Sequence, residues 1–175
     1  MPDRRHLWRG IHDPEMVRSG LTIDASAGAS RYRPGEIVSV TLTVENTRVG
    51  HAFPTYVTPR VVLSVELVDQ AGQVVVGSRE EKVIGRDVTL DLERELSDTR
   101  LMPGAEAVLH YRRRVERTGL RARLRVVVYP DEFYARFFES LLAQGAGRGE
   151  AQIHEALTAT RRSPFTVFDR EIPLT

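Results

Sequence analysis

Histidines are the residues whose type and position could carry chemistry in this chain. His51 lies in a Gly-His-Ala-Phe-Pro-Thr run at residues 50–55, and His6 and His12 flank Trp8 in a segment without hydrophobic periodicity. Neutral imidazole binds transition metals and haem iron, and a nearby aromatic ring can pack on a porphyrin. These three histidines are therefore candidate ligands. The alternative for each is a loop histidine that hydrogen-bonds to the backbone.

The other histidines and the common enzyme motifs carry no such expectation. His110 is predicted on the outer face of a strand and His154 among polar helical residues, so both are interpreted as surface side chains. The chain has no Gly-x-Ser-x-Gly, no phosphate-binding glycine loop, no His-Glu-x-x-His and no dinucleotide fingerprint. We therefore expect no enzyme. The alternative is a small metal-dependent enzyme that uses His6, His12, Asp13 and Glu15, whose spacing matches no known metal site.

Composition limits the classes of cofactor and partner. The 175 residues include no cysteine, which excludes disulfides, thiolate metal sites and covalent c-type haem attachment within this chain. The net charge of +1 creates no global field for nucleic acid, so no nucleic-acid partner is expected. No apolar run approaches the roughly 18–20 residues of a membrane span, so no membrane insertion is expected. Residues 1–8 are charged and have no apolar segment, so they do not read as a signal peptide. An exported protein would then be a processed form or a piece of something longer.

Strands are predicted around the candidate residues from alternating apolar and polar side chains. Residues 37–45 place Val38, Val40, Leu42 and Val44 on one face, and residues 61–69 repeat the pattern. Pro-Gly turns at 34–35 and 103–104 each precede a long alternating stretch. This organisation predicts a mainly β protein with an immunoglobulin-like antiparallel β-sandwich. Further strands are expected at residues 21–25, 74–76, 88–93 and 165–172.

A change of period after Pro130 predicts a helical segment over about residues 131–161. Asp131 is the expected N-cap, and an apolar stripe follows at helical spacing. The start of the chain has no hydrophobic periodicity, so the sequence predicts an irregular N-terminal arm over residues 1–20. A β-sandwich domain over residues 21–175 would carry the helical insertion before its last strand.

Arginines dominate the two strands on either side of residues 116–119. If these residues form a two-residue hairpin, one face pairs apolar residues, such as Tyr111 with Leu124, and the other face is basic. Like charges directly opposite one another are unfavourable, so acidic groups should lie nearby. They would come from a strand within residues 87–98, or from an acidic partner such as haem propionates or a protein. The predicted basic face consists of Arg112, Arg114, Arg121, Arg123 and Arg125.

Two stretches resemble the C-terminal part of bacterial multihaem c-type cytochromes. Residues 1–15 begin with Met-Pro and carry histidines, as segments that follow a haem-binding Cys-x-x-Cys-His in such proteins often do. Residues 50–55 are similar to a Gly-His-x-Phe-Pro-Thr motif in the β-domains that follow those haems. The resemblance covers most of the first 80 residues. This chain departs from the family because it has no Cys-x-x-Cys-His.

The resemblance implies a non-catalytic β-sandwich domain of an electron-transfer protein, which caps or docks haems in the periplasm or outside the cell. Any haem would be held by an adjoining multihaem segment or subunit. His6, His12 and His51 become candidate distal ligands, and Trp8 and Phe53 become candidate haem-packing residues. The alternative is an immunoglobulin-like module that binds protein or carbohydrate and has no haem role.

Overall fold

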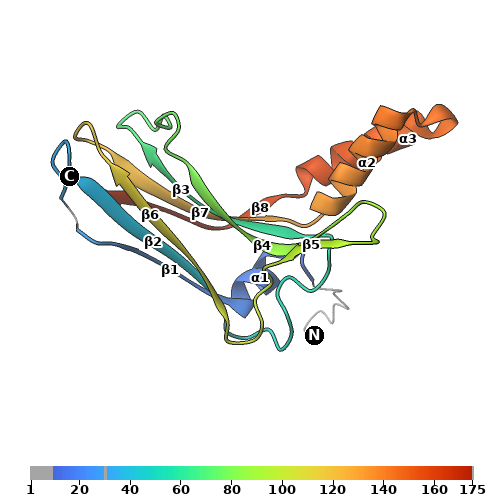
Figure 1. The fold of residues 1–175 in the computed structure, drawn as a ribbon, viewed down its shortest axis with the longest axis horizontal. Coiled ribbons are helices and arrows are strands. Elements are labelled where there is room, and N and C mark those ends of the chain that lie inside the picture. The colour runs from blue at the N-terminus through green and yellow to red at the C-terminus, as the bar shows by residue number, and fades with distance from the viewer. Residues whose placement is uncertain (1–9, 30, 175) are drawn as a thin grey trace, which may run out of the picture.

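The computed structural model describes residues 10–29 and 31–174, and within them two antiparallel sheets pack face to face (Figure 1). The three-stranded sheet has the order β1-β2-β6, and the five-stranded sheet has the order β5-β4-β3-β7-β8. This division of strands confirms the predicted immunoglobulin-like β-sandwich. The strands are β1 (Leu21–Ala27), β2 (Ile37–Asn46), β3 (Arg60–Val68), β4 (Glu80–Val88), β5 (Glu95–Asp98), β6 (Glu106–Arg114), β7 (Arg121–Tyr129) and β8 (Phe165–Pro173).

The core lies between the inner faces of the two sheets. In β2, alternate residues from Val38 to Val44 are at most 1% exposed, as the sequence pattern predicts. In β7, alternate residues from Ala122 to Val128 fill the same core from the other sheet. Each buried aliphatic side chain contributes about 1.5–3 kcal/mol relative to exposure. This burial fixes which residues of each strand point inward.

The predicted hairpin around residues 116–119 is wrong. Tyr111 of β6 pairs with Val40 of β2, whereas Leu124 of β7 pairs with Val65 of β3. The chain therefore crosses from one sheet to the other between β6 and β7. Tyr111 and Leu124 fill one core from opposite sheets, and they are not neighbours within a sheet.

Two further predicted strands differ from the structure. Residues 74–76 contribute only an isolated bridge, between Val74 and Val68. In place of the expected strand at 88–93, Val88 ends β4 and the residues after it form a turn that leads into β5. In it the Thr89 amide donates to the Arg94 carbonyl at 2.9 Å, and the Glu93 amide donates to the Asp91 carboxylate at 3.0 Å. The local bond to the Asp91 side chain competes with a sheet ladder, which explains the turn.

A short helix, α1 (Pro14–Gly20), occupies part of the predicted irregular arm. Asp13 caps it by accepting hydrogen bonds from the amides of Glu15 and Met16, at 2.9 and 3.0 Å. Pro14 at the first helical position needs no amide partner. Seven residues are too few for a periodic signal, so capping chemistry is what specifies this helix.

The predicted helical insertion before the last strand is confirmed. α2 (Glu132–Gln144) and α3 (Glu150–Arg162), joined by a 3-10 turn at Gly147–Gly149, form a hairpin that projects beyond the sheets (Figure 1). Asp131 occupies the N-cap position but makes no side-chain capping bond. Instead the carbonyl of Thr58 accepts from the Phe133 amide at 3.1 Å. None of the helices within residues 10–29 and 31–174 has the length and apolar character needed to cross a membrane.

Candidate functional site

An apolar groove of about 670 Å³ lies between α1 and the loop over residues 47–59, which joins β2 to β3. This volume is within the roughly 300–1,000 Å³ that small-molecule and cofactor pockets occupy. Met16 and Tyr56 are 48% and 70% exposed in it, although large apolar side chains usually seek burial. The groove therefore offers an apolar surface to a ligand or partner. Its apolar lining includes Ile11, Met16, Val17, Val49, Phe53 and Tyr56.

Asn46, which is fully buried, organises the loop that forms one wall of this groove. Its side-chain amide donates to the carbonyls of His51 and Leu101, at 2.9 and 3.0 Å. Its side-chain oxygen accepts from the Val49 amide at 3.1 Å. One side chain thus bonds three backbone groups, and two of them, the His51 carbonyl and the Val49 amide, belong to the loop.

The C-terminal end of α1 packs directly on the same loop. The Arg48 amide donates to the Gly20 carbonyl at 3.1 Å. A Cβ atom at Gly20 would lie 2.6 Å from Cγ2 of Val49, which is closer than real Cβ contacts. The absence of a side chain at Gly20 is therefore what allows the two walls to meet.

Arg100 anchors the far end of the loop. Its guanidinium donates to the Thr55 carbonyl at 2.9 Å and to the Asp98 carboxylate at 2.6 Å. This hydrogen bond holds the pKa of Asp98 below its usual range, because it stabilises the ionised carboxylate. The loop is therefore fixed at both ends by polar contacts.

His51 lines the groove, and its ring orientation is set by its neighbours. Its Nδ1 lies 3.0 Å from the Ala52 carbonyl and 3.1 Å from the Thr55 hydroxyl. A carbonyl can only accept, so Nδ1 is the protonated nitrogen of the neutral ring and Nε2 then carries the lone pair. Histidines that bind metals are usually oriented by such a bond from the other ring nitrogen. The exposed ring of His51 can therefore act as an Nε2 ligand.

His12 belongs to a different arrangement. Its Nε2 is 3.0 Å from Oδ1 of Asp131, next to α2, and its side chain is 61% exposed. The groove lining includes Ile11 but not His12, so the structure does not bring His12 and His51 to one site. No three His, Asp or Glu side chains of residues 10–29 and 31–174 gather closely enough to hold a metal ion. His6 and Trp8 lie outside the described residues.

Phe53 has a double role that its sequence position does not reveal. It is 5% exposed, belongs to the hydrophobic core, and also lines the groove. Its amide and carbonyl exchange 2.8 Å hydrogen bonds with those of Leu101. Sequence reasoning missed Met16 and Tyr56, which also line the groove and are far more exposed than Phe53. The available signal for Tyr56 was an aromatic residue in a proline-flanked loop outside any strand.

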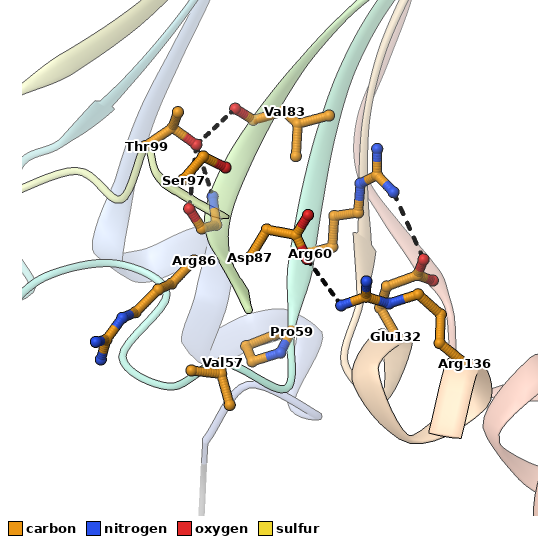
Figure 2. A pocket seen from close by; sticks show the side chains of 11 residues that line it. Val57, Pro59, Arg60, Val83, Arg86, Asp87, Ser97, Thr99, Glu132 and Arg136 are labelled. Carbon is orange, nitrogen blue, oxygen red and sulfur yellow. Dashed lines mark hydrogen bonds and ion pairs between the residues drawn. The ribbon is translucent and has the colours of Figure 1, made fainter. Parts of the chain in front are cut away.

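A second, smaller hollow of about 200 Å³ lies beside the first turn of α2 and contains paired charges (Figure 2). The Arg136 guanidinium lies 2.9 Å from the Asp87 carboxylate, and that of Arg60 lies 3.5 Å from Glu132. Pro59 lines both this hollow and the groove. These ion pairs attach α2 to the five-stranded sheet next to the groove loop.

The predicted basic face does not exist as one surface. Because β6 and β7 belong to different sheets, their outward residues lie on opposite sides of the sandwich. The outer side of the three-stranded sheet carries Arg112 and Arg114, and that of the five-stranded sheet carries Arg121, Arg123 and Arg125.

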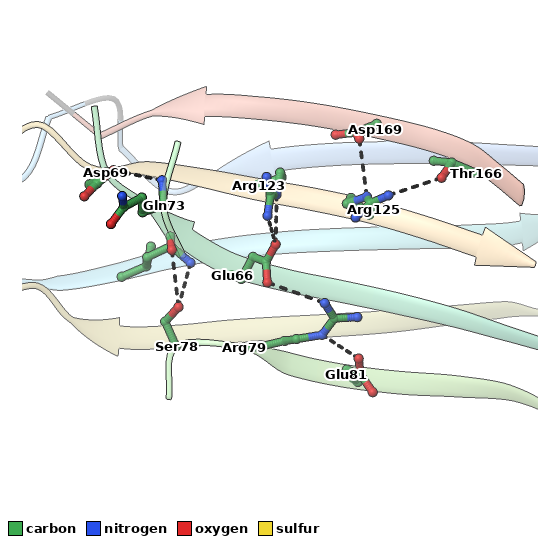
Figure 3. A network of polar contacts seen from close by, with 11 residues as sticks. Glu66, Asp69, Gln73, Ser78, Arg79, Glu81, Arg123, Arg125, Thr166 and Asp169 are labelled. Atoms are coloured by element: carbon green, nitrogen blue, oxygen red, sulfur yellow. Dashed lines mark hydrogen bonds and ion pairs between the residues drawn. The ribbon is translucent and has the colours of Figure 1, made fainter. Parts of the chain in front are cut away.

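Acidic residues of adjacent strands pair with the β7 arginines, and they do not come from residues 87–98 as one prediction had it (Figure 3). Nε of Arg123 donates at 2.8 Å to Glu66 of β3, which is 2% exposed. Nε of Arg125 lies 3.3 Å from Asp169 of β8. The charge of this strand is therefore balanced within the domain.

Comparison with known proteins finds that the fold is similar to part of a cytochrome. No family model and no curated protein sequence matches the chain. Its structure is similar to that of a penta-haem cytochrome c552 from Thermochromatium tepidum, with a TM-score of 0.65 and 16% identity over 95% of this chain. The match covers 42% of the cytochrome chain. This likeness concerns the fold.

Other similar structures align less well. The DNA glycosylase AlkC of Pseudomonas fluorescens has a TM-score of 0.39 and 12% identity, over 89% of this chain and 30% of that one. The ApaA protein of Bordetella pertussis has a TM-score of 0.38 and 11% identity, over 88% and 93% of the two chains.

Proposed function

We propose that this chain is a non-catalytic, haem-facing β-sandwich domain of a multihaem electron-transfer protein. In this proposal its groove lies against a haem held by an adjoining segment or subunit. The observation that carries the proposal is that both segments resembling multihaem cytochromes line one apolar groove. Gly10 and Ile11 come from the first segment, and residues 50–55 contribute His51 from the second. The fold shared with part of a penta-haem cytochrome supports the same reading.

His51 is the favoured iron ligand among the described histidines. Its Nδ1 is engaged by the Ala52 carbonyl and the Thr55 hydroxyl, so its Nε2 lone pair needs no rearrangement to bind iron. The Nε2 of His12 would first have to leave Asp131. An imidazole from this domain would fix the orientation of the haem and tune its potential.

The remaining groove residues would exclude water from the haem edge. Tyr56 and Met16 are exposed at the surface of the groove, while Phe53 connects it to the core. Covering these side chains with a porphyrin would remove apolar area from water, which is favourable at about 25 cal/mol per Å². In this proposal the domain works in the periplasm or outside the cell, together with its cytochrome.

A haem titration tests the proposal. Ferric haem is added to the purified chain, and the Soret band is followed for the wild type and for His51→Ala, His12→Ala and His6→Ala. We expect a saturable spectrum of imidazole-coordinated haem that His51→Ala removes. His154→Ala is the matched control, because the His154 side chain is 61% exposed, as that of His12 is, but lies on α3. If the wild-type chain and all histidine variants give the same spectrum, the ligand assignment is wrong. If no haem binds, an immunoglobulin-like module without a haem role becomes the better reading.

A further inference from the structure

Of the side chains that can be charged near neutral pH, those that line the groove are basic. Arg48 and His51 are its basic lining residues, and no Asp or Glu of the described chain lines it. The Arg48 side chain is exposed, and no hydrogen bond or ion pair within the described residues engages its guanidinium. Nearby arginines differ, since Arg18 donates to the carbonyls of β8 and Arg100 is paired with Asp98.

We infer that Arg48 binds a carboxylate of the ligand that occupies the groove. This inference rests on the proposed function: the carboxylate is a propionate of the haem held by the adjoining segment or subunit. A guanidinium recognises a carboxylate through two parallel N–H···O bonds, which fix geometry as well as contributing energy. A haem matches all three parts of the site: its apolar ring the groove wall, its iron the imidazole of His51, and its propionate Arg48.

Hydrogen bonds hold the backbone of the loop at Arg48 and at His51. The Arg48 amide is bonded to the Gly20 carbonyl at 3.1 Å, and the next amide, of Val49, is bonded to Asn46. Asn46 also holds the His51 carbonyl, so one buried side chain holds the backbone at Val49, next to Arg48, and at His51. Arg48 would therefore favour one orientation of the porphyrin, the one that places the propionate edge at its end of the groove.

Paired titrations with haem and with haem dimethyl ester, whose propionates carry no charge, test this assignment. We expect Arg48→Ala to weaken haem binding by about three- to ten-fold, as for an exposed charge-assisted contact. The same variant should leave affinity for the dimethyl ester unchanged. Arg48→Lys should recover part of the haem affinity, because it keeps the charge but loses the planar fork. Arg112→Ala is the matched control, since Arg112 is also exposed and belongs to β6.

The outcomes separate this inference from the proposed function. If the wild type binds neither porphyrin, both fail. If haem binds and Arg48→Ala behaves like Arg112→Ala, the haem-facing role stands and the propionate assignment falls. An equal loss for haem and for the ester would also overturn the assignment, because the effect would then be one of packing and not of charge.

Discussion

Asn46→Ala is expected to destabilise the domain and to loosen the groove at the same time. Asn46 is 0% exposed, and its amide makes three hydrogen bonds to backbone groups of the loop and of Leu101. Alanine removes all three. The Leu101 carbonyl keeps a second donor, the Phe53 amide, but the His51 carbonyl and the Val49 amide lose the partner that holds them.

The magnitude follows from these bonds. A net contribution of about 1 kcal/mol per hydrogen bond gives about 3 kcal/mol for the free energy of unfolding. For a chain of this size, about 3 °C of melting temperature per kcal/mol corresponds to a shift of about 9 °C. Asn46→Asp should cost at least as much, although its volume is almost unchanged, because a carboxylate oxygen would face two carbonyl oxygens.

Urea titrations followed by circular dichroism measure these effects, and Gln152→Ala on the exposed surface of α3 is the control. Haem titrations of the same variants measure whether the groove keeps its affinity for haem. The reasoning is refuted if Asn46→Ala costs less than about 1 kcal/mol, the net value of a single hydrogen bond. It is equally refuted if Asn46→Asp is as stable as the wild type.

Three further substitutions test other parts of the structure. Gly20→Ala should cost about 1–3 kcal/mol of unfolding free energy in urea titrations, because the new Cβ meets Val49 at 2.6 Å; an unchanged midpoint would contradict that contact. Glu66→Gln should cost about 2–4 kcal/mol and lose the salt bridge to Arg123, and equal stability would show that its burial is unimportant. Burial raises the pKa of Tyr111 to about 12. The unfolded tyrosine ionises near pH 10, so stability should fall between about pH 10 and 12, and Tyr111→Phe should lose less stability over that window. Within residues 10–29 and 31–174 the Tyr111 hydroxyl has no hydrogen-bond partner, so Tyr111→Phe should be nearly neutral at pH 7.

Alternation allowed the buried face of each long strand to be predicted, but not its neighbours. The pattern of residues 37–45 identifies Val38 to Val44 as core residues because any antiparallel partner would bury the same face. The pattern around residues 116–119 is equally regular on both sides, and it fits a hairpin as well as a crossing between sheets. Only the pairing of β6 with β2 and of β7 with β3 distinguishes the two.

The candidate site shows the same division. The Gly-His-Ala-Phe-Pro-Thr run marked His51 because a histidine in a loop of that composition interrupts the strand pattern. Nothing in the run predicts that Asn46 holds the loop, since the last residue of a strand gives no sign of where its amide points. The aromatic residue in the loop was a signal for Tyr56, but the sequence did not show that Tyr56 and Met16 line the groove. Their exposure depends on how α1 meets the loop.

The sequence by itself therefore determined the β-sandwich, the helical insertion and the chemical character of individual residues, because these depend on local period and composition. Tertiary structure decided which of those residues act together. It separated the arginines of β6 and β7 onto opposite sides, and it directed the Nε2 of His12 to Asp131. It also placed His51 and Arg48 on one groove. The physical reason is that strand order, and contacts between residues distant in the chain, are set by how the sheets close the core.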